Sequence, residues 1–375
     1  MNIFVSKNYM VRKHTMNDNF VNALITWYLY NKRELPWRET TNPYFIWISE
    51  VILQQTRVAQ GLPYYEKIID EFPTINLLAA SSEEKILKLW QGLGYYSRAR
   101  NMHTAAKQVM AEFNGQFPNN YTELLLLKGV GEYTAAAVAS LAFNEPVAVV
   151  DGNVIRVISR YFGITEPIDK PVVLKKIKSL AQELLLKEKP ALYNQAIMEF
   201  GALQCVPANP QCGNCPVFWH CQALKDKMVN QIPAKQSKTK VRERFFYYLI
   251  IKEGKNVFLN KRPSGDIWEG LYDFPLIETE KQIELHELMK NHSWQLFFGD
   301  KSIHIKQISS LVKHILSHQR LNVHFINIEA GNLLTNYPDN WIRINADTIH
   351  GIAVPRLIDR YIHSNDFNKL FADCT

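Results

Sequence analysis

The sequence lacks any apolar run close to the roughly 20 residues that a helix needs to cross a bilayer. The stretch before Asn17 carries basic side chains but no continuous apolar core, so it does not qualify as a secretory signal. We interpret residues 1–16 as an N-terminal extension, with Met16 as an alternative start of translation. These absences predict an intracellular protein without a membrane partner, such as one in the bacterial cytoplasm near the nucleoid.

Cysteine is scarce and unevenly placed, with five residues in all, four of them close together. A disulfide framework would be spread through a small secreted domain, so this clustering indicates metal binding instead. The spacing is Cys205-x6-Cys212-x2-Cys215-x5-Cys221, whereas a structural zinc site commonly uses two close pairs. Four thiolates in this wider ring suit an iron–sulfur cluster, and Cys374 is a bystander.

Length and charge narrow the class of protein. At 375 residues the chain exceeds what one core usually holds, so we expect two domains. A hydrophobic share of 47% with 21% charged residues is typical of a folded protein rather than a disordered one. The formal net charge of +7 fits a polyanionic partner such as nucleic acid, although many folded proteins are mildly basic.

The first part of the chain, from Asn17 to about Cys221, has helical patterns and no long strand-like alternation. Apolar residues recur at helical spacing over residues 45–58, and residues 81–84 carry the signature of a capped helix start. Residues 133–141 are rich in alanine, the strongest helix former. This part is therefore predicted to be all-α.

The second part follows a polar, basic stretch at residues 222–244 that has the composition of a linker. β-prone runs at 245–251 and 257–259 flank a glycine-containing turn, which predicts a hairpin, and residues 322–326 form a further predicted strand. Together with helix-like segments, these runs predict a smaller α+β domain.

A glycine-containing turn lies between two helical segments. Gly129 and Gly131 permit a tight turn and expose backbone N–H groups at the start of the next helix, which is a ready site for an anion. Lys128 adds a positive charge that a phosphate could use. On its own, the pattern is more often an ordinary helical hairpin.

Two carboxyl groups lie beside apolar segments. Burial of Glu50 beside its apolar helical stripe would raise its pKa and keep it protonated near neutral pH, and Asp151 ends an apolar run before Gly152. Cleavage of a glycosidic bond needs a protonated leaving group and a stabilised oxocarbenium ion, and two carboxyl groups can divide that work. Taken singly, each residue has an ordinary explanation. Glu50 could lie on a solvated helix face, and Asp151 could be a helix cap or part of a turn.

The cysteine spacing, the segment 194–202 before it and the glycine turn resemble the endonuclease III superfamily of DNA glycosylases. With Glu50 and Asp151, they resemble its MutY branch of adenine glycosylases over about residues 17–375. The resemblance implies an all-α helix-hairpin-helix glycosylase domain with a [4Fe-4S] cluster on the four cysteines, followed by an α+β Nudix-like domain. The implied boundaries are 17–36 with 146–224 for the cluster module, 37–145 for a six-helix barrel, 225–240 for a linker and 241–375 for the mispair-recognition domain.

The resemblance also implies a reaction, the excision of adenine mispaired with 8-oxoguanine or guanine in double-stranded DNA, by a monomer. Glu50 would protonate adenine N7, Asp151 would stabilise the sugar cation and help to activate water, and Asn153 would assist. Superfamily members that also cut the DNA strand carry a lysine where this sequence has Tyr133, and a phenol cannot form their imine. We therefore expect a monofunctional enzyme that leaves an abasic site.

Further residues are implied to contact DNA once the adenine has been flipped out of the stack. Near the adenine pocket, the implied contacts are Arg33, Trp37 and Arg38. Around the base opposite adenine, they are Gln55, Thr56, Leu93, Tyr95, Ser317 and His318. At the glycine turn, they are Lys128, Gly129 and Gly131.

Residues 261–275 resemble the Nudix-like domain of MutY proteins, but the glutamate-rich Nudix helix is absent after Gly270. Without those carboxylates no Mg²⁺ site is expected, so this domain should bind and not hydrolyse. Leu316 stands where the family's recognition loop usually opens with phenylalanine.

Three alternatives stay open at this point. The first is a related glycosylase for damaged pyrimidines or oxidised guanine, which Tyr133 and the Nudix-like domain disfavour. The second is a Nudix pyrophosphatase with a DNA-binding arm, which the missing catalytic helix disfavours. The third is a non-catalytic iron–sulfur protein that binds DNA, against which the presence of both Glu50 and Asp151 weighs.

Overall fold

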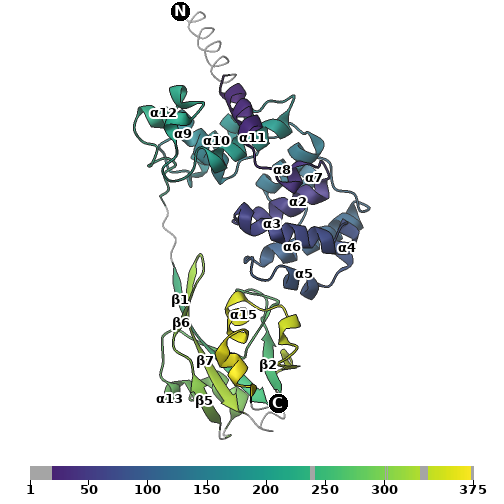
Figure 1. Ribbon diagram of the computed structural model, residues 1–375, viewed down its shortest axis with the longest axis vertical. Coiled ribbons are helices and arrows are strands. Elements are labelled where there is room, and N and C mark those ends of the chain that lie inside the picture. The colour runs from purple at the N-terminus through teal and green to yellow at the C-terminus, as the bar shows by residue number, and fades with distance from the viewer. Residues whose placement is uncertain (1–18, 237–240, 300, 302, 330–336, 373–375) are drawn as a thin grey trace, which may run out of the picture. The chain divides into compact units, whose positions relative to one another are not determined.

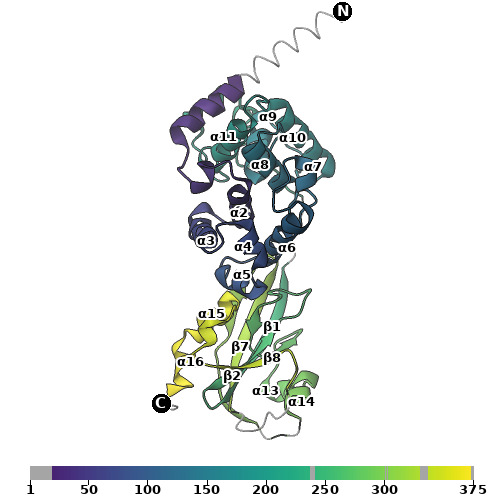
Figure 2. The same cartoon turned by 90° about the vertical axis from the view of Figure 1, so that its right-hand side faces the viewer.

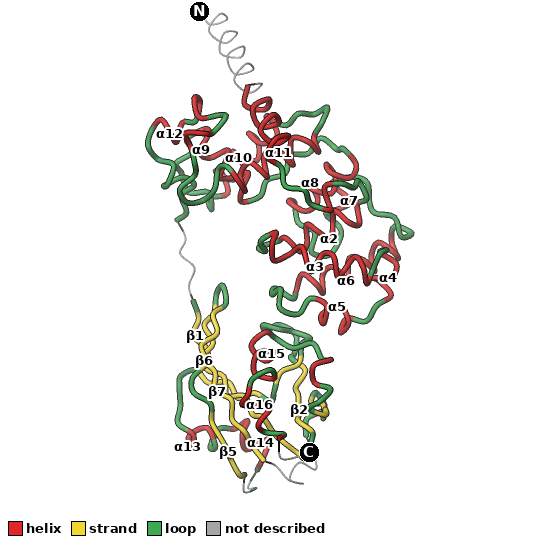
Figure 3. Tube along the Cα trace, in the orientation of Figure 1, coloured by secondary structure: helices red, strands yellow, loops and turns green. Residues whose placement is uncertain are grey.

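A computed structural model describes residues 19–236, 241–299, 301, 303–329 and 337–372 (Figure 1). The chain divides into two compact units, one of Met1–Ala80 with Thr104–Lys238 and one of Ser81–His103 with Thr239–Thr375. The strands of the described chain all fall in the second unit, and the first is helical, as Figure 3 shows. The predicted order of an all-α part followed by an α+β part is confirmed. No helix in the described ranges combines the length and apolarity needed to cross a bilayer.

The first unit is built from a helix over residues 19–31 and a series of short and medium helices. In chain order these are α2 (Pro43–Leu53), α3 (Val58–Glu71), α4 (Ile75–Ala80), α6 (Ser97–Glu112, which begins in the second unit), α7 (Tyr121–Leu124), α8 (Glu132–Phe143), α9 (Gly152–Phe162), α10 (Pro171–Leu184), α11 (Pro190–Leu203) and α12 (Gln222–Lys225). Phe20 and Leu24 of the first helix pack with Val157 of α9, Ile177 of α10 and Phe200 of α11. This apolar core joins segments distant in sequence and thereby fixes the start of α9.

The helix predicted over residues 45–58 is shorter in the structure, because α2 ends at Leu53. Gln55 adopts a left-handed backbone conformation with φ of 56°, which cannot continue an α-helix. Thr56 then closes the turn by donating its N–H to the Leu53 carbonyl at 3.1 Å. The sequence pattern predicted one longer helix because the next helix, α3, begins at Val58 and continues the apolar spacing.

The second unit is an eight-stranded sheet flanked by short helices. Its elements are α5 (Glu83–Leu89), β1 (Arg242–Glu253), β2 (Asn256–Lys261), β3 (Tyr272–Asp273), β4 (Leu276–Thr279), α13 (Leu285–Leu288), α14 (His292–Phe298), β5 (His304–Ile308), β6 (Val312–Ile315), β7 (Gln319–Glu329), β8 (Trp341–Asn345), α15 (Arg356–Ile362) and α16 (Asn365–Lys369). The strand order is β3-β2-β1-β7-β5, with β4 on β1, β6 on β7 and β8 on β2. Only the β1–β7 pair is parallel among these pairings. The predicted hairpin around Gly254 is the β1–β2 connection.

Strand β1 is buried on both faces, which explains why its sequence is a continuous apolar run without alternation. Phe246 and Tyr248 point into one core with Ile358 of α15, and Tyr247 and Leu249 point into another core on the opposite face. In Figure 2 the sheet lies between α15–α16 on one side and α13–α14 on the other.

The described start of the stretch predicted as a linker packs against the first unit. Ile232 is buried, its carbonyl accepts a hydrogen bond from Arg160 Nε at 2.9 Å, and the Ala234 carbonyl accepts one from the Ile168 N–H at 3.0 Å. Composition alone therefore did not reveal that Ile232 and Ala234 pack with the helical unit.

Close packing between α9 and α11 depends on Gly201. A Cβ at this position would lie 2.7 Å from the Asn153 Cβ and 2.9 Å from the Asn153 carbonyl oxygen. We expect Gly201→Ala to lower the free energy of unfolding by about 1–3 kcal/mol, because overpacking displaces backbone here. Gly152→Ala, at a site with open space around the added methyl, is the matched control. Thermal melting with equal midpoints for the two variants would show that the packing is not as tight as described.

Candidate active site

Glu50 lies in the last turns of α2 and is 5% exposed. The helix is buried over most of its length, and Glu50 lies among its buried residues. Burial raises the pKa of Glu50 to about 7, the Tyr133 hydrogen bond lowers it, the charge of Asp151 raises it and Arg38 lowers it. This carboxyl group is therefore divided between its protonated and ionised forms near neutral pH, as general acid catalysis requires.

Tyr133 is the second residue of α8, directly after the glycine turn. Its hydroxyl donates a hydrogen bond to Glu50 Oε2. Burial, the charges of Glu50 and Asp151 and the Glu50 hydrogen bond raise the pKa of Tyr133 well above its usual range, so it remains a neutral phenol. In the turn, Gly129 has φ of 75°, which favours glycine, and Lys128, Gly129 and Gly131 are exposed.

Asp151 is the N-cap of α9, and its Oδ1 accepts a hydrogen bond from the Val154 N–H at 2.7 Å. Its Oδ2 accepts a second one from Asn153 Nδ2, also at 2.7 Å. Burial raises the pKa of Asp151, and these hydrogen bonds and the charge of Arg156 oppose that rise. Asp151 is thus a helix cap, as its sequence context alone would suggest, and the capping hydrogen bonds also fix its carboxylate in the pocket.

Arg156, one turn further along α9, ties Asn153 to the cysteine segment. Its Nη2 donates to Asn153 Oδ1 at 2.8 Å and to the Gly201 carbonyl at 2.6 Å, and its Nε donates to the Cys205 carbonyl at 2.7 Å. The position of Asn153 is therefore coupled to the backbone at the end of α11.

Glu199 of α11 is a site residue that the sequence analysis missed. It is 1% exposed and accepts hydrogen bonds from both predicted arginines: from Arg33 Nε at 2.8 Å and Nη2 at 2.5 Å, and from Arg38 Nη1 at 3.0 Å and Nη2 at 2.7 Å. Burial alone would raise the pKa of Glu199, but the hydrogen bonds of Arg33 and Arg38 lower it to about 2. A carboxylate within an apolar helix was the only signal in the sequence that could have identified it.

These groups line one pocket of about 550 Å³, within the size range of sites that enclose a small ligand. The predicted residues that line it are Glu50, Tyr133, Asp151, Asn153, Arg33, Trp37, Arg38 and Thr56. Gln55 is exposed on the turn after α2, outside this lining.

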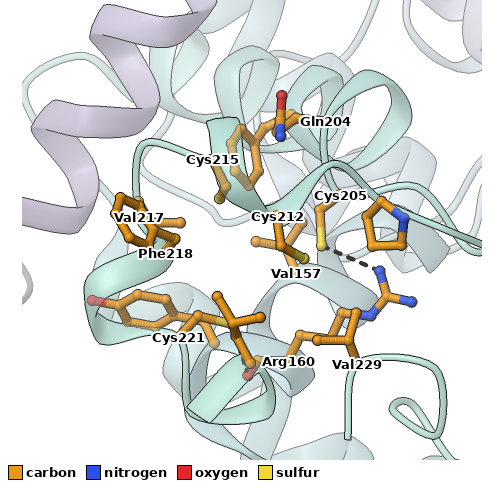
Figure 4. Close-up of a pocket in the computed structure, with 14 residues that line it drawn as sticks. Val157, Arg160, Gln204, Cys205, Cys212, Cys215, Val217, Phe218, Cys221 and Val229 are labelled. Carbon is orange, nitrogen blue, oxygen red and sulfur yellow. Dashed lines mark hydrogen bonds between the residues drawn. The ribbon is translucent and has the colours of Figure 1, made fainter. Parts of the chain in front are cut away.

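The four clustered cysteines line a second pocket of the first unit, shown in Figure 4. No disulfide joins them, and Arg160 Nη1 donates to Cys205 Sγ at 3.4 Å. No group of three or more His, Cys, Asp or Glu side chains in the described ranges is close enough to hold a single metal ion. Four thiols around a shared space suit a larger group better than one ion, because the ligands of a cluster bind different iron atoms. Cys374 lies outside the described residues.

A third pocket, of about 390 Å³, belongs to the second unit and contains the other predicted recognition residues. Leu93, Tyr95, Ser317 and His318 line it, and the hydroxyls of Tyr95 and Ser317 are hydrogen-bonded. Tyr95 has φ of 49° and is 42% exposed, whereas Tyr96 is buried. Leu316 also lines this pocket and packs against the sheet core.

Comparison with known proteins agrees with this arrangement. Residues 48–186 match the model of the HhH-GPD superfamily of base excision DNA repair proteins, and residues 246–364 match that of the NUDIX domain. The adenine DNA glycosylase of Buchnera aphidicola subsp. Baizongia pistaciae is 36% identical over 344 residues, 90% of this chain and 94% of that protein. The adenine DNA glycosylase of Homo sapiens is 30% identical over 407 residues, 93% of this chain and 74% of that protein.

The helical fold has a solved counterpart in a thermostable thymine-DNA glycosylase, with a TM-score of 0.54 and 31% identity over 57% of this chain and 99% of that one. Identity to the adenine enzymes extends through both units, and the two family models cover the glycosylase and Nudix parts separately. The chain therefore belongs to the adenine DNA glycosylase family, the MutY branch of the HhH-GPD base excision repair enzymes.

Proposed function

We propose that the protein hydrolyses the N-glycosidic bond of adenine mispaired with 8-oxoguanine or guanine and leaves an abasic site in an uncut strand. The observation that carries this proposal is the pairing of buried Glu50, with a pKa near 7, and Tyr133 at the position of the imine-forming lysine. The first supplies a proton to a leaving base at neutral pH, and the second removes the route to strand cleavage.

Glu50 acts as the general acid. Its protonated form donates to N7 of the flipped-out adenine, which turns the base into a neutral leaving group as the bond to C1′ lengthens. When Glu50 is ionised, the Tyr133 hydroxyl donates a hydrogen bond to its carboxylate and keeps the group oriented toward the pocket. Because Tyr133 has a pKa well above its usual range, it does not compete for the proton.

Asp151 stabilises the positive charge that develops on the sugar. Its carboxylate is fixed by the backbone of Val154 and by Asn153, so no reorganisation is needed when the oxocarbenium ion forms. The same carboxylate then accepts a proton from the attacking water, and the water oxygen completes the abasic sugar.

The ion-paired group of Glu199, Arg33 and Arg38 forms the polar wall of the adenine pocket beside Trp37. Planar guanidinium and carboxylate groups suit the edge of a purine, and the indole ring offers an apolar face. At the glycine turn, Lys128, Gly129 and Gly131 are proposed to bind a phosphate next to the flipped nucleotide.

The base opposite adenine is proposed to be read by two sets of residues. Tyr95 and Leu93 contribute an exposed ring and an apolar contact, and Ser317 and His318 contribute hydrogen-bonding groups for 8-oxoguanine. Gln55 and Thr56 are proposed to contact this base from the turn after α2.

Cys205, Cys212, Cys215 and Cys221 are proposed to hold a [4Fe-4S] cluster. Bound to four thiolates, the cluster would tie the loop after α11 to the following turns and so stabilise the fold. Their shared pocket and the Arg160 hydrogen bond to Cys205 support this assignment.

The role of Glu50 predicts a falling rate at alkaline pH. A general acid with a pKa of about 7 is lost as pH rises, so the single-turnover rate of adenine release should fall about tenfold per pH unit well above 7. Glu50→Gln should slow release at least about 100-fold below pH 7, with DNA binding retained, and the difference from the wild-type protein should shrink as pH rises above 7. A pH-independent rate up to pH 9 would contradict this role.

The same raised pKa affects stability. Between pH 4.5 and about 7 the folded state binds a proton at Glu50 that the unfolded chain releases, so this group's contribution to stability decreases as pH rises through that window.

The absence of a lysine at position 133 predicts the product. With a duplex containing adenine opposite 8-oxoguanine, the enzyme should release adenine, leave the strand intact and resist borohydride trapping. A duplex containing thymine glycol should be left unchanged. Covalent trapping as efficient as that of a lysine-dependent glycosylase would refute the monofunctional assignment.

The cysteine assignment predicts coloured protein with equal amounts of iron and acid-labile sulfide. Cys212→Ala should remove the visible absorbance and lower the melting temperature, because the cluster loses a ligand. Cys374→Ala is the matched control and should keep both. Zinc without sulfide in the purified wild-type protein would disprove the cluster.

A further inference from the structure

The loop between β2 and β3 forms part of the pocket that contains Ser317 and His318. Asp266, Ile267 and Trp268 of this loop line the pocket, but sequence patterns did not assign them a role in recognition. An inference from this loop rests on the proposed function, because the ligand considered is the base opposite adenine.

Trp268 has a strained backbone. Its φ is 62°, in the left-handed region that bulky side chains rarely adopt. Strained residues of this kind persist only when neighbouring contacts fix them, and they concentrate at ligand-binding sites.

The residues just before Trp268 in the chain are held in place by two buried arginines, Arg262 and Arg244. Arg262 Nη2 donates a hydrogen bond to Asp266 Oδ2 at 2.5 Å, and Arg262 Nε donates one to the Ile267 carbonyl at 3.0 Å. Arg244, whose side chain is 4% exposed, holds Asp266 with two hydrogen bonds of 2.8 Å. The same guanidinium donates to Gln319 Oε1 at 3.1 Å, next to His318, so one cation connects the Trp268 loop with the Ser317–His318 turn.

The residues just after Trp268 in the chain are held in place as well. Arg100 of α6 donates to the Glu269 carbonyl at 2.6 Å and to Glu269 Oε2 at 3.1 Å, and the Leu271 N–H closes a turn onto the Trp268 carbonyl at 3.0 Å. Seven hydrogen bonds between five residue pairs thus hold a backbone conformation that a bulky side chain disfavours. The edge contact between Trp268 and His314, with ring centroids 5.9 Å apart, accounts for part of the packing but not for the strained backbone.

The indole carries a chemical group that suits the proposed ligand. Trp268 is half-buried in the pocket wall, and its Nε1–H has no hydrogen-bond partner within the described part of the chain. 8-Oxoguanine differs from guanine by a carbonyl oxygen at C8, which accepts a hydrogen bond, and an indole N–H only donates. We propose that Trp268 is a further specificity-determining residue, which contacts the base opposite adenine and donates its N–H to O8 of 8-oxoguanine.

The test uses Trp268→Phe, which keeps an aromatic ring but removes the donor. Single-turnover adenine release is measured opposite 8-oxoguanine, guanine and 8-bromoguanine, which fills the C8 position without a strong acceptor. The preference for 8-oxoguanine over guanine should fall roughly three- to tenfold, as expected for one hydrogen bond. Rates opposite guanine and 8-bromoguanine should be unchanged. Trp219→Phe, which alters an 80% exposed tryptophan of the first unit, is the control.

Two results would overturn the inference while leaving the proposed function intact. One is an unchanged preference for 8-oxoguanine in Trp268→Phe, and the other is an equal loss opposite all three bases, which would indicate a purely structural role. Failure of the wild-type protein to release adenine from any of the three duplexes would instead refute the proposed function itself.

Discussion

The burial of the Glu50 carboxyl group beside a phenol is the constraint on which the rest of the site depends. Tyr133 is its hydrogen-bond donor among the described residues, and burial is the main cause of its pKa near 7. A full ion pair would have kept the carboxyl ionised, as Arg33 and Arg38 do for Glu199 in the same pocket. The protein thus keeps one carboxyl group able to give up a proton and another permanently charged, within one cavity.

Buried guanidinium groups organise a pocket in each of the two units. Arg156 links Asn153 to the backbone at Cys205, and in the second unit Arg244 links Asp266 to Gln319. Each arginine satisfies acceptors from segments that are far apart in sequence, so its removal would leave several buried groups unpaired. Rigid positioning by such networks fits the proposed discrimination between bases by single hydrogen bonds.

Local signals in the sequence predicted much of this arrangement. The capped start at Ser82, the alanine-rich α8 and the hairpin at Gly254 follow from propensity and turn chemistry, and all are present. The sequence could not predict where tertiary contacts override the pattern. The ion pairs of Glu199 and the contacts of Arg244 and Arg100 with the Trp268 loop join residues that are distant in the chain. The end of α2 at Leu53 instead follows from the left-handed backbone of Gln55, which the apolar spacing did not reveal. The apolar run at residues 245–251 did predict strand β1, and burial of the strand on both faces explains why the run does not alternate.

The buried Glu50 carboxyl group is expected to be half-protonated at neutral pH before any DNA binds. This protonation state is tested most directly by a carbon-13 NMR titration of glutamate side-chain carboxyls in the DNA-free protein, with the Glu50 resonance assigned by its loss in Glu50→Gln. This resonance should titrate with a midpoint at about pH 7. A midpoint at the ordinary value of 4.5 would contradict it.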